Sequence, residues 1–175
     1  QCAPAQPTPP VPLKLYMNPK ATFAGYNFNV VDANGNLLYK VESVGSMYLY
    51  KARICYPDGT EILRIEQSKK ATWMTLKFEI YSGDRFITHI NQEIRGTHYV
   101  YDVPELGLFI DGSNYAISMD VHRNNEIIAH VAKKVFSFGD TYELTVNNPA
   151  DAHLMMAAVM VVQLCIGHAR RRRRR

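Results

Sequence analysis

Residues 154–162 read Leu-Met-Met-Ala-Ala-Val-Met-Val-Val, an apolar run that decides the fold. Pro149 and Asp151 precede the run and suit the first turn of a helix, and residues 152–166 contain no turn residues. A helix that is apolar on every side must be surrounded by protein or lipid. A membrane span needs about 20 apolar residues, whereas this run is shorter and is bracketed by His153 and Gln163. The pattern therefore favours a helix that forms the core of the domain.

The preceding sequence alternates between apolar and polar residues, as strands with one buried face do. The clearest example is residues 72–81, where Met74, Leu76 and Phe78 alternate with polar side chains before a Ser-Gly-Asp turn. Many short strands separated by turns predict a sandwich or barrel, and strands closed around the apolar helix would bury both elements. We therefore expect a mainly β fold, an antiparallel barrel around a central helix. The expected strands are 26–30, 37–41, 48–56, 62–65, 72–81, 86–90, 97–103, 108–110, 115–121, 127–135 and 142–146.

The length and charge of the chain predict one domain with two tails. Its 175 residues suffice for one well-buried core. Residues 1–12 hold five of the nine prolines, which predicts a disordered arm. We expect the barrel domain to span residues 13–167, with its helix ending at Gly167. Residues 168–175 are then expected to form a solvated basic tail. The net charge is +4, but six arginines lie in the tail, so the body of the domain is nearly neutral. The basic pI is therefore no argument for a nucleic-acid surface on the domain.

Cysteine usage predicts an intracellular protein. Cys2, Cys55 and Cys165 are an odd number at wide spacing, which fits neither a disulfide framework nor a paired metal site. Residues 1–12 lack a basic segment followed by an apolar one, so no signal peptide is expected, although a trimmed precursor is an alternative. We expect a cytoplasmic protein, or one peripheral at a membrane, with the arginine tail allowing a nuclear location.

No catalytic motif is found in the sequence, which contains no glycine-rich phosphate loop, nucleophile elbow or His-Glu-x-x-His helix. The helix would also fill the barrel and leave no cleft. We expect a protein without enzymatic activity, catalytic residues, metal or cofactor. Asp32 to Asn36 lacks the closing glutamate of a calcium loop and reads as a hairpin turn. His122 and His130 could face each other across a hairpin, but no third metal ligand is suggested, and Cys165 reads as a small core residue.

Two segments of the chain resemble LURP-one-related proteins, which belong with Tubby C-terminal domains and phospholipid scramblases. They are residues 28–41 (FNVVDANGNLLYKV) and residues 125–135 (NEIIAHVAKKV), the latter followed by Phe138-Gly139-Asp140-Thr141-Tyr142 and the apolar helix. The similarity extends over residues 13–166. The resemblance implies a twelve-stranded barrel wrapped around a hydrophobic C-terminal helix. It also implies phosphoinositide binding, as in Tubby domains, or a link to lipid movement, as in scramblases.

A phosphoinositide site requires several cationic side chains that converge on phosphates. The alternative is that these cations form an ordinary solvated barrel face, balanced by Glu61, Glu66, Glu79 and Glu93. The candidate site residues are Lys51, Arg53, Lys69, Lys70 and Lys77, with Lys133 and Lys134 as further cations and the tail arginines Arg170, Arg171, Arg172, Arg173, Arg174 and Arg175 as electrostatic support.

Three functions remain open at this point. The first is a binding module that recognises acidic phospholipid headgroups or a protein partner. The second is a scaffold that presents loops and the proline-rich arm, and the third is a scramblase-like membrane protein whose helix leaves the barrel. Nucleic acid is expected as a partner only through the arginine tail, and the chain is expected to be a monomer.

Overall fold

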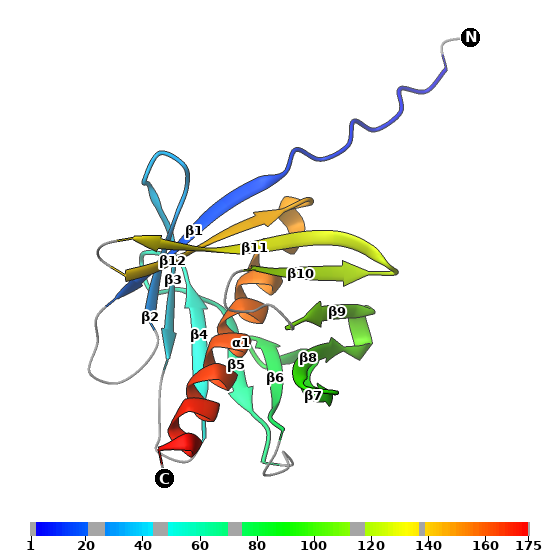
Figure 1. The fold of residues 1–175 in the computed structure, drawn as a ribbon. Coiled ribbons are helices and arrows are strands. Elements are labelled where there is room, and N and C mark those ends of the chain that lie inside the picture. Colours follow the sequence, from blue (N-terminus) through cyan, green and yellow to red (C-terminus); the bar gives the residue numbers. More distant parts are fainter. Residues whose placement is uncertain are drawn as a thin grey trace.

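The computed structural model describes residues 3–20, 27–43, 49–69, 75–112, 118–136 and 139–174, and they form a closed antiparallel barrel. Each strand pairs with its neighbours in the chain, and β1 also pairs with β12, which closes the sheet (Figure 1). The predicted barrel is confirmed. Its twelve strands are β1 (Leu13–Lys20), β2 (Asn27–Val31), β3 (Leu37–Ser43), β4 (Lys51–Cys55), β5 (Glu61–Gln67), β6 (Lys77–Ser82), β7 (Arg85–Arg95), β8 (His98–Val103), β9 (Leu108–Asp111), β10 (Ser118–Arg123), β11 (Glu126–Phe136) and β12 (Gly139–Val146).

The helix α1 (Ala152–Arg173) runs through the barrel, as the apolar run predicted (Figure 1). Met156, Met160 and Val161 have no exposed surface, and the inward-facing residues of the strands pack around them. By length and composition, residues Pro149–Arg173 would suffice to cross a membrane, and their most apolar 18 residues have a mean hydropathy of 1.7, but 72% of those residues are buried inside the protein. Protein, rather than lipid, surrounds the apolar helix here.

The end of α1 corrects one expectation. The helix was expected to end at Gly167, with residues 168–175 as a disordered tail, but it continues to Arg173. Gly167 is buried in the barrel rather than placed at a helix terminus. Arginine is a good helix former, so the basic run extends the helix beyond the barrel.

Strand bounds also differ from the expectation where pairing across the barrel decides them. β7 was expected to end at Ile90 but continues to Arg95, because Gln92 pairs with Tyr101 and Arg95 with His98. β6 begins at Lys77 rather than at Thr72, and residues 72–74 lie outside the described part of the chain. Gly139 and Asp140, expected to form a break, belong to β12.

Four strands are irregular near the same end of the barrel. The pairing register shifts at Val30/Val31, Ile54/Cys55, Ile80/Tyr81 and Val121/His122, each close to the turn that follows the strand. Such bulges bend a strand and increase its twist, which helps a sheet to close.

The connections at that end carry carboxylates, and we call it the acidic end. Consecutive antiparallel strands alternate in direction, so every second connection lies at the same end. α1 starts here, where Arg123 contacts Asp151 at 3.2 Å. His153 packs against Tyr39 with ring centroids 5.1 Å apart. The acidic residues of this end are Asp32, Asp58, Glu61, Asp84, Glu105, Glu126 and Asp151, with Lys40, Arg85 and Arg123 among them.

Glu105 fastens the short helix η1 (Pro104–Leu106) to β7. Its carboxylate accepts hydrogen bonds from the Thr88 hydroxyl at 2.8 Å and the His89 backbone N–H at 3.1 Å, and it also contacts the His89 ring. Partial burial alone would raise the pKa of Glu105, but these hydrogen bonds lower it to about 2.

We predict that this clamp gives the fold an acid-sensitive contribution. The pKa of Glu105 is lower in the folded protein than its unperturbed 4.5, so the contribution is complete above that pH and is lost as the pH falls towards 2. The side chain is partly exposed, and solvent screening limits the contribution to about 1 kcal/mol. Urea unfolding of wild type and Glu105→Gln at about pH 7, above this window, and at about pH 3, inside it, measures the contribution. The difference between the two proteins should shrink at the lower pH, and an unchanged difference would contradict the prediction.

Candidate functional site

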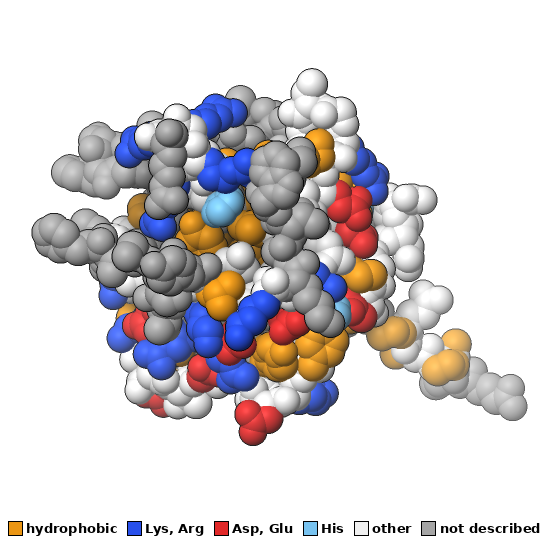
Figure 2. All heavy atoms as spheres, turned by 90° about the horizontal axis from the view of Figure 1, so that it is seen from below, with side chains coloured by type: hydrophobic (Ala, Val, Ile, Leu, Met, Phe, Trp, Pro, Cys, Tyr) orange, Lys and Arg blue, Asp and Glu red, His pale blue; other side chains and the backbone are white. Residues whose placement is uncertain are grey.

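Cationic side chains gather at the opposite end of the barrel, where α1 finishes. We call this the basic end, and Figure 2 looks onto it: Lys and Arg side chains are spread over this face, with Asp and Glu among them on one side. Carboxylates there include Glu66, Glu93 and Asp111 near strand ends. The described cations of the basic end are Lys20, Lys51, Lys69, Lys77, Arg95, Lys134 and Arg170 to Arg174.

The predicted headgroup residues lie on three neighbouring strands at or near this end. Lys51 and Arg53 are on β4, Lys69 is exposed in the turn after β5, and Lys77 begins β6. Lys70 lies outside the described residues. The structure thus places the four described candidates on one side of the barrel.

Carboxylates already contact two of these candidates. Lys51 Nζ lies 3.9 Å from Glu66, and Arg53 donates two hydrogen bonds to Glu42 at 2.9 and 3.1 Å. Arg64 on β5 adds contacts with Glu66 and Glu61 at 2.9 and 3.3 Å. Along this wall of the barrel, positive and negative side chains form a mixed network, as the alternative interpretation supposed.

The arginine segment of α1 has few carboxylate neighbours. No ion pair is recorded for Arg170, Arg171 or Arg173 within the described residues. Arg171 lies over the Tyr50 ring, 5.8 Å from its centroid, and the His168 ring meets the same tyrosine at 5.9 Å. Burial, together with Arg172 and Arg171, lowers the pKa of His168, which favours its neutral form.

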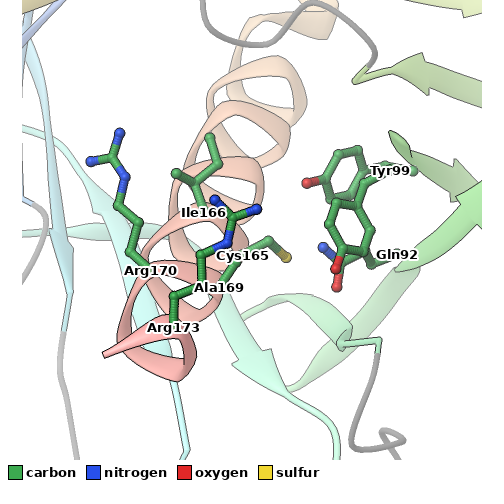
Figure 3. A pocket seen from close by; sticks show the side chains of 8 residues that line it. Gln92, Tyr99, Cys165, Ile166, Ala169, Arg170 and Arg173 are labelled. Atoms are coloured by element: carbon green, nitrogen blue, oxygen red, sulfur yellow. The ribbon is translucent and has the colours of Figure 1, made fainter. Parts of the chain in front are cut away.

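A crevice of about 110 Å³ opens between the last turns of α1 and strands β7 and β8 (Figure 3). The strand side contributes Gln92, Tyr99 and Tyr101, of which Gln92 and Tyr101 are buried and Tyr99 is half-buried. Gly112 packs behind them, where an added Cβ would lie 2.5 Å from the Tyr99 carbonyl oxygen. The helix side contributes Cys165, Ile166, Ala169, Arg170 and Arg173.

Polar contacts organise the floor of this crevice. Gln92 Oε1 accepts a hydrogen bond from the Leu76 backbone N–H at 3.0 Å, and the Gln92 backbone N–H donates to the Leu76 carbonyl oxygen at 2.9 Å. Tyr101, which pairs with Gln92 across the sheet, and Cys165 line the same floor. Burial raises the pKa of both Tyr101 and Cys165, so the phenol and the thiol stay neutral. Cys165 is therefore a buried thiol without nucleophilic character, as expected.

The sequence contains part of the signal for this crevice. Five lining residues of α1 follow helical spacing and share one face: Cys165, Ile166, Ala169, Arg170 and Arg173. The expectation that the helix ends at Gly167 hid this pattern. Tyr99 and Tyr101 alternate along an expected strand. Gln92 carried no signal, because the strand was expected to stop before it.

Metal-ligating residues do not cluster in the described ranges: no group of three or more His, Cys, Asp or Glu side chains is found there. The Asp32 carboxylate accepts hydrogen bonds from Asn34 and Asn36 within its own turn. His122 and His130 do not face each other, because the register of β10 and β11 pairs Asp120 with His130 and His122 with Ile127. His130 instead contacts Asp120 at 2.6 Å.

A closed antiparallel barrel around its own C-terminal helix is the Tubby-like architecture, and this fold defines the class of the protein. The chain belongs to the LURP-one-related family, whose family model matches residues 13–163.

An X-ray structure of a protein from Arabidopsis thaliana has a similar fold, with a TM-score of 0.62 and 18% sequence identity over 89% of this chain and 91% of that chain. No curated protein matches the sequence.

Proposed function

We propose that the protein is a non-enzymatic binding module that docks its basic end on acidic phospholipid headgroups, as an intracellular protein peripheral at a membrane. The observation that carries the proposal is the separation of charge along the barrel. Carboxylates occupy the connections of the acidic end, whereas the arginines of α1 project from the other end. A molecule with this distribution is attracted to an anionic surface in one orientation.

Membership of the LURP-one-related family, with its Tubby-like barrel, supports a binding role. Phosphoinositides are the proposed preferred headgroups, and the proposed contacts include Lys51, Lys69 and Lys77 besides the arginines. Arg53 is held by Glu42 and contributes less.

Vesicle sedimentation tests the orientation. Wild type should bind vesicles containing phosphatidylserine or phosphatidylinositol bisphosphate more strongly than phosphatidylcholine vesicles, and salt should weaken the binding. The double variant Lys69→Gln/Arg174→Gln should bind roughly 30-fold more weakly, because each surface cation contributes about 1 kcal/mol.

The matched control is Lys40→Gln/Arg85→Gln, which removes the same charge from the acidic end. It should change the vesicle affinity less than about twofold, since these cations would face away from the membrane. Equal losses in the two variants would contradict the proposed orientation, and no binding to any acidic vesicle would contradict the function.

A protein-interaction scaffold is the second candidate. Residues 3–12 form no helix or strand, are exposed and extend away from the barrel (Figure 1). The mixed charges of the β4 and β5 wall also fit a protein-facing surface. Absence of vesicle binding in the experiment above would favour this candidate.

A further inference from the structure

The crevice between α1 and β7–β8 has the features of an anion site. Its rim carries Arg170 and Arg173, two exposed guanidinium groups without a recorded carboxylate partner among the described residues. Below the rim, Tyr99 is half-buried and has no recorded hydrogen-bond partner for its hydroxyl within the same ranges. Cationic and neutral donors thus line the crevice, with Arg170 at its outer edge, and no Asp or Glu lines it.

The floor of the crevice is fixed before any ligand arrives. Tyr101 and Gln92 are 3% and 8% exposed and pair across β7 and β8, and Gln92 exchanges two hydrogen bonds with the Leu76 backbone, at 3.0 and 2.9 Å. Figure 3 shows Gln92 and Tyr99 on the strand side opposite Cys165 of α1, with Arg173 beside the last turn of the helix and the Arg170 side chain extending to the other side of the helix. The floor of the crevice is closed and carries neutral side chains, whereas its open rim carries arginines. A ligand would therefore bind with its charged group near the arginines.

We infer that this crevice binds a single phosphate monoester group. A monoester presents three terminal oxygens, which can accept from the Arg173 guanidinium and the Tyr99 hydroxyl, while Arg170 adds positive charge at the outer edge of the crevice. Its one ester bond can lead out of the barrel, whereas a diester would need room for two substituents. The volume of about 110 Å³ exceeds that of one water and suits a group of this size.

The phosphate can be carried by a lipid headgroup or by a soluble molecule. The inference deepens the proposed function, and the lipid-borne case rests on it. The soluble case does not, because it needs no membrane.

Calorimetric titration of the full chain with inorganic phosphate tests the site directly. Wild type should bind phosphate in preference to acetate. Arg170→Gln/Arg173→Gln should weaken phosphate binding at least tenfold, and Tyr99→Phe about fivefold, because each removes donors from the crevice. All three side chains involved lie outside the buried core, and circular dichroism verifies that the variants remain folded.

Lys40→Gln/Arg85→Gln is the control, since it removes equal charge from the acidic end, outside the crevice and outside the proposed headgroup-binding surface. It should leave phosphate affinity within about twofold. Failure of wild type to bind phosphate, equal binding of acetate, or an equal loss in the control would overturn the inference.

Vesicles separate the two sources of phosphate. If the phosphate is lipid-borne, phosphatidic acid should bind more tightly than phosphatidylglycerol, and the Arg170/Arg173 variant should lose this preference. Phosphate binding without that preference assigns the site to a soluble monoester. Vesicle binding by a protein that does not bind phosphate overturns the inference while leaving the proposed function intact.

Discussion

Met160→Asp is expected to abolish soluble folded protein, and Met160→Ala to lower the free energy of unfolding by about 2–5 kcal/mol. Met160 has no exposed surface and lies midway along α1, where the inward-facing strand residues surround it. A carboxylate there would be buried without a partner, a cost comparable to the whole stability of a domain. Soluble yield reports on the first variant, and urea unfolding followed by circular dichroism on the second.

The control is Ile127→Ala, which removes a similar amount of apolar side chain from the surface. Ile127 is 49% exposed, and its replacement should cost less than about 0.5 kcal/mol. Wild-type stability in Met160→Asp would mean that α1 does not occupy the barrel. It would reopen the scramblase-like alternative, in which the helix leaves the strands for lipid.

The central helix could be predicted because its signal is local. Residues 154–162 have no polar face, so any soluble fold must surround them. The strand pattern supplied the surrounding element, since β6 and β10 bury alternate residues as the sequence suggested. Together these two patterns predicted the barrel before any spatial information was considered.

The end of α1 could not be predicted in this way. Gly167 followed by a basic run reads as a helix stop, yet the barrel buries Gly167 and Tyr50 stacks against His168 and Arg171. These tertiary contacts stabilise an additional helical turn that the local sequence alone does not predict.

The site could be predicted only in part, because it depends on distant residues. Lysines on β4 and β6 were recognisable as cations, but whether a glutamate neutralises them depends on strand pairing, as with Lys51 and Glu66. The crevice joins β7, β8 and the last turns of α1, which lie far apart in the sequence. Local sequence patterns do not indicate that these three elements lie next to one another in the fold.

Gln92→Leu is expected to lower the free energy of unfolding by about 1–3 kcal/mol, because it leaves a buried backbone N–H without its acceptor. Gln92 Oε1 accepts from the Leu76 backbone N–H at 3.0 Å, and leucine offers no acceptor. Urea unfolding measures the loss, with Glu93→Gln as the neighbouring, outward-facing control expected within about 0.5 kcal/mol of wild type.

Gln92→Glu separates the role of the hydrogen bonds from that of shape, because it keeps the size of the side chain and an acceptor for Leu76. Burial should raise the pKa of the introduced carboxyl above its unfolded value, so its folded form favours the protonated state. The variant should therefore approach wild-type stability at low pH and lose stability as the pH rises past the unfolded pKa of about 4.3. A variant equally stable at pH values of about 4 and 8 would show that position 92 is open to water, and the crevice would then lack the fixed floor on which its selectivity for phosphate depends.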